Sequence, residues 1–166
     1  TLTLGETIKV SSNVGISQFA LRLSPEEQYL ALRDFGFGTP PAVGFPAEAA
    51  GVLYRPPWVN YKLSQPSLAQ GYEFMATSLQ VASAYAAIAN GGVLLAPSLV
   101  REVRAPGVTT PIWQHHRTPV RQSVSPAIAS QLRSYLRLAT DSGGSGAKAQ
   151  LDFFTVIGKT ATAKLR

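Results

Sequence analysis

The sequence of 166 residues contains no cysteine, a single methionine and only nine acidic residues. The absence of cysteine excludes a disulfide framework and a thiolate metal site, although it fits the cytosol and a bacterial envelope equally well. No run of about eighteen apolar residues occurs, so the sequence predicts no membrane span. The first residues also lack the basic and hydrophobic regions of an export signal, so we expect any signal or anchor to lie outside this sequence.

Charged residues make up 14% of the sequence and hydrophobic residues 45%, which predicts one globular domain or most of one. The formal net charge of +6 would suit nucleic acid, an anionic membrane surface or an anionic cell-wall polymer. Nucleic-acid binding is disfavoured because the arginines of the second half are scattered and are not grouped with stacking aromatics. These residues are Arg101, Arg104, Arg117, Arg121, Arg133 and Arg137. We expect a solvated, mildly basic surface and no nucleic-acid partner.

Two tripeptides, Ser11-Ser12-Asn13 and Lys159-Thr160-Ala161, lie near opposite ends of the sequence. A hydroxyl and an amide can assist at a reacting bond, and a fixed cation with neighbouring hydroxyls can hold an anionic substrate. Each tripeptide alone is a weak signal, because serine and asparagine also begin helices for structural reasons. The Gly-Lys-Thr sequence also ends a phosphate-binding loop, but Phe153 stands where that loop requires glycine, so a nucleotide site is disfavoured.

Capping residues and apolar periodicity predict four helices. The tripeptide Ser11-Ser12-Asn13 forms the entry of the first helix, and Ser24 and Glu27 form a capping box at the start of the second. The predicted helices run from Val14 to Leu23, from Pro25 through Leu32 to a stop near Gly36, from Thr77 to Asn90, and from Ser125 to Asp141.

The stretch from Gly36 to Pro66 is rich in glycine and proline, which predicts an ordered surface excursion in place of a helix or a central strand. Its interleaved aromatic residues favour burial over a flexible linker. Residues 93–124 alternate β-branched residues with turns and predict a hairpin-like lobe. A Gly/Ser loop at 142–146 precedes a predicted β-strand from Phe153 to Leu165, which carries the second tripeptide.

The two tripeptides gain weight from the runs that accompany them. These runs are Ser11-Ser12-Asn13-Val14-Gly15, Phe35-Gly36-Phe37-Gly38, Gly44-Phe45-Pro46-Ala47-Glu48-Ala49-Ala50-Gly51, Gln70-Gly71-Tyr72, the segment from Leu79 to Gly92, and Gly158-Lys159-Thr160-Ala161-Thr162-Ala163. In this order they closely resemble class B penicillin-binding proteins of the cell-division type, over nearly the whole sequence. The tripeptides match the second and third active-site motifs of that family.

The resemblance implies an α+β fold, the penicillin-recognising serine transpeptidase fold, in which helices pack around a five-stranded antiparallel sheet. Residues 1–166 would supply mainly the helical lobe and one active-site strand of a partial transpeptidase domain. Such proteins are D,D-transpeptidases that cross-link peptidoglycan stem peptides through a serine acyl-enzyme during septal cell-wall synthesis, and β-lactams target them. The resemblance further implies anchoring at the extracytoplasmic face of the bacterial inner membrane, other division proteins as partners, and no cofactor or metal.

The resemblance also implies a role for each motif residue. Ser11 would relay a proton to and from the departing or attacking amine, and Asn13 would hydrogen-bond the substrate amide and orient a lysine base. Lys159 would supply a positive field, while the hydroxyls of Thr160 and Thr162 would hold the substrate carboxylate. The backbone N–H of Thr162 would form half of an oxyanion hole.

Two departures from the family pattern stand out. Ala161 occupies the position of the third motif where the family has glycine, which places a methyl group where substrate approaches closely. The first motif, Ser-x-x-Lys with the nucleophile, does not precede Ser11, so we expect the nucleophile outside this sequence and the chain alone to be catalytically incomplete. Ser145-Gly146-Ala147-Lys148 fits Ser-x-x-Lys, but it follows the second motif and lies in a glycine-rich loop, so we interpret it as a coincidence.

Two further features favour structural interpretations. The pair His115-His116 has no other ligand at metal-binding spacing, so we expect a surface or hairpin position. Glu48 is interpreted as a structural carboxylate of the Gly/Pro excursion. Two alternative functions stay open: a non-catalytic penicillin-binding-like scaffold that contacts division proteins, and a β-lactam-hydrolysing or sensing relative. The second ranks last, because no segment resembles the family loop that supplies a deacylating base.

Overall fold

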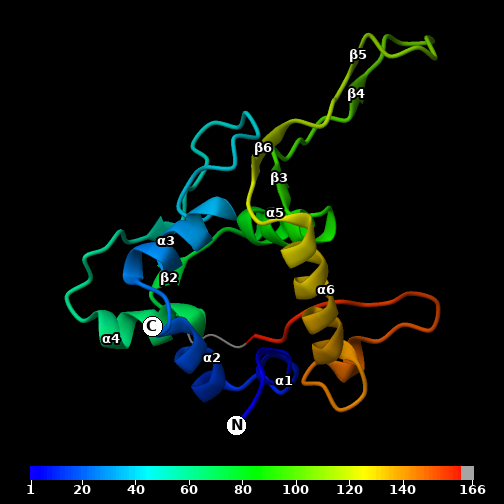
Figure 1. The fold of residues 1–166 in the computed structure, drawn as a ribbon. Helices are drawn as coiled ribbons and strands as arrows, with labels where there is room; N and C mark the ends of the chain where they lie inside the picture. Colours follow the sequence, from blue (N-terminus) through cyan, green and yellow to red (C-terminus); the bar gives the residue numbers. More distant parts are fainter. Residues whose placement is uncertain (162–166) are drawn as a thin grey trace.

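The computed structural model describes residues 1–161, and its helices are arranged as an open ring (Figure 1). The helices are α1 (Leu4–Lys9), α2 (Asn13–Ala20), α3 (Pro25–Asp34), α4 (Tyr61–Ala69), α5 (Ser78–Ala89) and α6 (Pro126–Thr140), followed by the 3-10 helix η1 (Ala147–Ala149). Helix α1 packs against α6 and α2, α2 packs against α4, and α5 packs against α6. Within residues 1–161, no helix combines the length and apolar character that crossing a bilayer requires.

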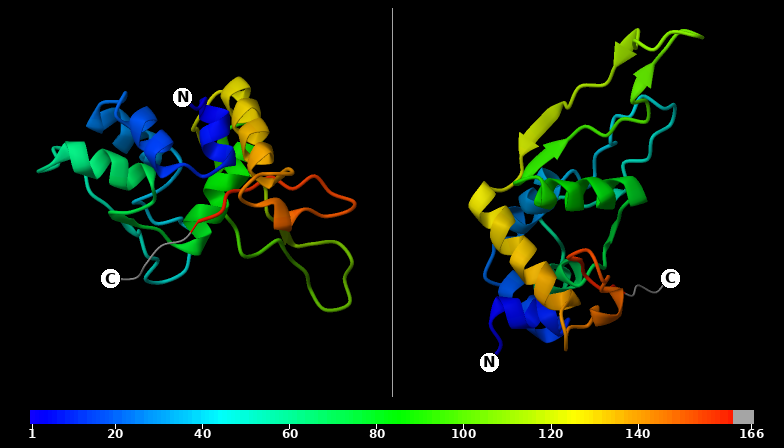
Figure 2. Two further views of the ribbon diagram at one scale, coloured as in Figure 1. Left: turned by 90° about the horizontal axis from the view of Figure 1, so that it is seen from below. Right: turned by 90° about the vertical axis from the view of Figure 1, so that its right-hand side faces the viewer.

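Among residues 1–161, the strands form three short antiparallel pairs. Strand β1 (Val52–Leu53) pairs with β2 (Phe74–Met75), β3 (Val93–Leu95) with β6 (Pro119–Gln122), and β4 (Glu102–Val103) with β5 (Trp113–Gln114). The last two pairs form a long arm that projects away from the ring of helices (Figure 2). This arm confirms the hairpin-like lobe predicted for residues 93–124.

Local capping explains where the predicted helices begin. The hydroxyls of Ser12, Ser24, Thr77 and Ser125 each accept a hydrogen bond from a backbone N–H in the first turn of α2, α3, α5 and α6. All four predicted helices are confirmed, with α2 ending three residues earlier than expected. Helix α1 was not predicted, although Thr3 and Glu6 form a capping box that is visible in the sequence.

Helix α4 corrects the prediction for the Gly/Pro excursion, because it contains Pro66 in its interior. A proline there removes one helical hydrogen bond and costs about 3 kcal/mol. Tertiary packing offsets that cost: Leu68 is buried, and the buried Gln65 donates from Nε2 to the Leu23 carbonyl at 2.8 Å. The expected burial of the aromatic residues was also wrong in part, since Phe45 and Tyr54 are exposed.

The predicted strand from Phe153 to Leu165 is wrong over residues 153–161, which form no strand in the structure. A strand needs a hydrogen-bonded neighbour, and within the described residues this segment makes only isolated hydrogen bonds, with α6, with the loop after it and with Ser11. The rest of the predicted strand, including Thr162, lies outside the described residues.

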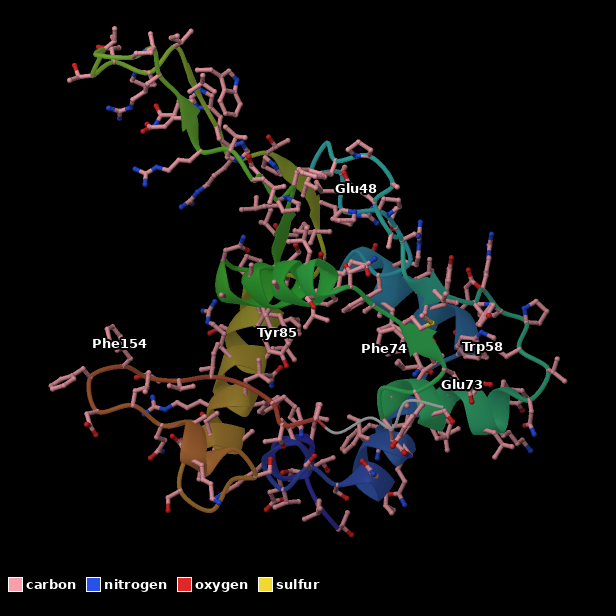
Figure 3. All side chains as sticks on the ribbon, turned by 180° about the vertical axis from the view of Figure 1, so that it is seen from behind. Glu48, Trp58, Glu73, Phe74, Tyr85 and Phe154 are labelled. Carbon is pink, nitrogen blue, oxygen red and sulfur yellow. The ribbon has the colours of Figure 1, made fainter. Side chains whose placement is uncertain are left out.

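The chain has a small apolar core for its length. Its buried hydrophobic residues are mostly alanines, and the largest fully buried side chains among the described residues are Gln65 and Thr7. The surface measures 11310 Å², whereas a compact monomer of this length exposes about 8,000 Å². Figure 3 shows Tyr85 and Phe74 on the inner side of the ring and Phe154 pointing away from it. Large apolar side chains such as Phe154 are exposed, which is typical of a surface that packs against another layer of a protein.

Candidate active site

The second and third motifs meet at one point in the structure. The ammonium group of Lys159 donates to the hydroxyl of Ser11 over 2.6 Å, across 148 positions of sequence. Lys159 also donates to the carbonyl of Thr160 at 3.0 Å. The structure thus brings together a hydroxyl from one predicted motif and a cation from the other.

Helices α1 and α2 hold Ser11 in the tight corner between them. Its backbone is left-handed, with a φ of 56°, a conformation that costs a residue with a side chain of order 1–3 kcal/mol and often marks a functional site. The next residue, Ser12, caps α2 by accepting from the Gly15 N–H at 3.1 Å. Gly15 lets the helices approach, because a Cβ there would lie 2.7 Å from the Thr7 side chain. The expected position of the motif at a helix start is confirmed.

Asn13 is the first residue of α2 and is exposed beside Ser11. Within residues 1–161, its side-chain amide makes no hydrogen bond, whereas its backbone carbonyl accepts from Ser17. The amide therefore keeps both its donors and its acceptor for a ligand.

Lys159 lies in a partly desolvated position, which lowers the pKa of its ammonium group below the ordinary value for lysine. Burial disfavours the charged form, so a bound anion near Lys159 would gain more from the charge than it would in water. The hydroxyl of Ser11 can accept from this cation while donating its own proton elsewhere.

Helix α6 positions the segment that carries Lys159. The hydroxyl of Thr140, at the end of α6, lies 2.6 Å from the Val156 carbonyl, and the Gly158 N–H donates to the Leu136 carbonyl at 3.3 Å. Thr140 is only 3% exposed, so its contact with Val156 is sheltered from water. The third motif is therefore fixed by tertiary contacts in place of a strand ladder.

A cavity of about 480 Å³ opens beside the Ser11–Lys159 contact. Both motifs line it through Ser11, Asn13, Lys159, Thr160 and Ala161. A second wall comes from α4 and the segment that follows it, which contribute Leu68, Gln70, Gly71, Tyr72 and Phe74. The predicted site residues up to Ala161 thus share one cavity, whereas Thr162 lies outside the described residues.

The sequence did not single out Thr7 and Phe74 as residues of this cavity. Thr7 lies on α1, so the capping box of Thr3 and Glu6 was the signal that could have located it. Phe74 is placed by β2 and packs edge-on against Phe37, with ring centroids 5.6 Å apart. No local pattern in the sequence predicts that contact.

The other residues that the sequence singled out, His115, His116 and Glu48, do not line this cavity. His115 and His116 are on the projecting arm, next to β5, as expected. Glu48 accepts from the Gly44 and Phe45 N–H groups at 2.8 and 3.1 Å. Desolvation alone would raise the pKa of Glu48, but the backbone N–H groups of residues 42–45 outweigh it and hold the pKa below its usual value. These contacts fit the expected structural role in the loop.

The match to known proteins covers nearly the whole chain. The family model described as the penicillin-binding protein transpeptidase domain matches residues 1–165. Penicillin-binding protein PbpB of Mycolicibacterium smegmatis is 34% identical over 163 residues, which cover 93% of this chain and 24% of that protein. A probable peptidoglycan D,D-transpeptidase, PenA of Neisseria flavescens, is 30% identical and is matched over 99% of this chain and 38% of its own length.

Solved structures of penicillin-binding proteins are also similar to this chain. The transpeptidase domain of penicillin-binding protein 3 from Burkholderia pseudomallei superposes with a TM-score of 0.83 at 31% identity, covering 99% of this chain and 46% of that one. Penicillin-binding protein 3 from Mycobacterium tuberculosis, solved with ampicillin, gives a TM-score of 0.76 at 30% identity over 90% of this chain and 34% of that one. The chain therefore spans less than half the length of these relatives. The fold class and the family resemblance inferred from the sequence are confirmed.

Proposed function

This chain belongs to the penicillin-binding protein transpeptidase domain family, and we propose that it is part of a peptidoglycan D,D-transpeptidase that cross-links stem peptides. The observation that carries the proposal is the 2.6 Å contact between Lys159 Nζ and Ser11 Oγ on the wall of one cavity. An acyl transfer needs a proton relay and a fixed positive charge at one place, and this pair supplies both.

In the proposed reaction, a serine supplied outside residues 1–166 gives its proton to a lysine base, and its oxygen bonds to the carbonyl carbon of the donor stem peptide to form an ester. The peptide bond breaks, and Ser11 passes a proton to the departing amine. The acceptor amine then attacks the acyl-enzyme and returns a proton through Ser11. Asn13 binds the substrate amide, Lys159 with the Thr160 and Thr162 hydroxyls holds the substrate carboxylate, and the Thr162 N–H forms half of the oxyanion hole.

We place residues 1–166 within a larger domain that contributes the nucleophile helix and the remaining strands. The excess exposed surface and the alanine-rich core support this proposal, because both call for a covering layer. The parent protein would act in septal wall synthesis at the extracytoplasmic face of the inner membrane, bind β-lactams and contact other division proteins. The solved complex of a relative with ampicillin supports the β-lactam proposal.

One observation favours transfer over hydrolysis of the acyl-enzyme. Among residues 1–161, no aspartate or glutamate lines the cavity. A β-lactam-hydrolysing enzyme needs a carboxylate or an equivalent base to activate the deacylating water. Within the described residues the cavity supplies no carboxylate for hydrolysis, and we propose transfer of the acyl group to an amine acceptor.

The proposal is tested by a cross-linking assay on the purified parent protein. A pentapeptide stem donor and an amine acceptor should give a cross-linked product with release of the terminal D-residue, and the Lys159→Ala variant should give at least about a hundredfold less. A parent protein that binds the donor but forms no product would favour the alternative of a non-catalytic scaffold. Ala161 is the one motif residue that favours this alternative, because it places a methyl group where the family has glycine.

A further inference from the structure

The Gly/Ser loop after α6 reaches the third motif. The hydroxyl of Ser145 lies 2.9 Å from the hydroxyl of Thr160, within hydrogen-bond distance. In the sequence, Ser145 opens a Ser-x-x-Lys that we interpreted as a coincidence. The structure places it beside a residue that the proposed function assigns to the substrate carboxylate.

We infer that Ser145 is a positioning residue that fixes the hydroxyl of Thr160 for binding the substrate carboxylate, an inference that rests on the proposed function. A hydroxyl has one proton and two acceptor positions, and a carboxylate only accepts. When Thr160 donates to a carboxylate, its oxygen is left to accept, and Ser145 can then donate to it. The two hydroxyls form a short chain in which each hydrogen bond strengthens the next.

The loop is held in place by its backbone. The Ser145 N–H donates to the Lys9 carbonyl at 3.0 Å, and the Gly146 N–H donates to the Ala139 carbonyl at 2.8 Å. At Gly144 a Cβ would overlap the carbonyl oxygens of Leu138 and Ala139, so only glycine allows this close return to α6. Removing the Ser145 hydroxyl leaves all of these contacts intact.

The same geometry argues against Ser145 as a nucleophile. Lys148 lies on η1, and within the described residues the Ser145 hydroxyl has its hydrogen bond with Thr160 and none with Lys148. A serine needs an adjacent base to attack a carbonyl. Ser145 therefore acts through Thr160 and forms no bond with the substrate acyl group.

The experiment measures second-order acylation of the parent protein by a penicillin that carries its ring carboxylate and by the methyl ester of the same penicillin. Three variants are compared with the wild type: Ser145→Ala, Ser145→Thr, and Ser142→Ala as the control from the same loop. Loss of one net hydrogen bond corresponds to a change of about two- to tenfold. Ser145→Ala should lower the rate with the carboxylate by that factor and leave the slower rate with the ester unchanged. Ser145→Thr and Ser142→Ala should react like the wild type.

A double variant separates positioning from a folding defect. In a Thr160→Val background, Ser145→Ala should slow acylation no further, because the hydroxyl that it positions is gone. An unchanged rate with the carboxylate in Ser145→Ala would overturn the inference, as would equal losses with both penicillins or additive losses in the double variant. Absence of any acylation in the wild type would overturn the proposed function, and the inference with it.

Discussion

Ser11 and Lys159 meet at one cavity, but the structure holds them by different means. Ser11 sits between two helices that are capped by their own neighbouring residues, in a strained corner fixed by α1 and α2. Lys159 sits on a segment without regular structure, held by Thr140 and Leu136 of α6 and by the loop at Ser145. The first half of the site is thus built locally, and the second half depends on contacts distant in sequence.

Because the two halves of the site are held by different kinds of contact, we expect substitutions in each half to have different effects. Changes near Ser11 should act mainly on the stability of α2, because local caps fix the motif. Changes at the contacts of α6 should move the third motif and therefore act on the reaction itself. Four substitutions in the parent protein test this contrast.

The largest effect is expected for Lys159→Ala. Removing one preorganised charge should slow acylation by a penicillin about a hundredfold or more. The rate is measured by the time course of covalent labelling, with Lys148→Ala on η1 as the matched control. If both variants label at the wild-type rate, Lys159 has no electrostatic role. The contrast between the Ser11 half and the Lys159 half of the site would then have no basis.

The second effect is expected for Thr140→Val, which removes the donor to the half-buried Val156 carbonyl. The free energy of unfolding should fall by about 1–3 kcal/mol. Acylation should also slow, because Lys159 shares the segment. Thr140→Ser keeps the hydroxyl and loses only a buried methyl group, so labelling should match the wild type while the free energy of unfolding falls by about 0.8 kcal/mol. Normal acylation in a destabilised Thr140→Val protein would show that α6 does not position the motif.

A smaller effect is expected for Ser12→Ala, which removes the cap of α2. Loss of a helix cap costs about 1 kcal/mol, so unfolding should occur at lower denaturant concentration. The folded protein should keep an acylation rate nearer to the wild type than Thr140→Val does, and Ser12→Thr should restore the stability. Slower acylation in Ser12→Ala than in Thr140→Val would reverse the proposed contrast between the two halves.

The smallest effect is expected for Ala161→Gly. The methyl group of Ala161 lines the cavity, so its removal should speed acylation if it crowds the substrate. The added backbone freedom should cost about 0.5–1 kcal/mol of stability. Labelling rate and thermal unfolding measure the two effects separately. A loss of stability without a gain in rate would mean that the site has adapted to alanine.

The sequence predicted the locally determined parts of the fold. Helices α2, α3, α5 and α6 follow from caps such as Ser24 and Thr77, which act within one turn of the chain. Helix α4 was missed because its proline is compensated by tertiary contacts with α2, with α3 and with the Leu23 carbonyl, which no local pattern reveals. The strand near Lys159 was wrong over 153–161 for the same reason, because a strand depends on a neighbour from elsewhere.

Like the fold, the candidate site has one part that the sequence predicted and another that depends on tertiary contacts. The motifs at Ser11 and Lys159 were recognised from their residue types and order, and the structure brings them into contact. The role inferred for Ser145 could not be read from the sequence, where its spacing to Lys148 pointed to a different motif. Only the fold of the loop back onto α6 places its hydroxyl beside Thr160.

We propose that this chain carries the relay and the anion-holding half of an acyl-transfer site whose nucleophile lies outside residues 1–166. The most direct test is to label the parent protein with a penicillin, digest it and locate the adduct by mass spectrometry. A single adduct should form on the serine of a Ser-x-x-Lys motif outside these residues, and none on the isolated chain. An adduct on Ser11 or Ser145 would show that the nucleophile lies within this chain.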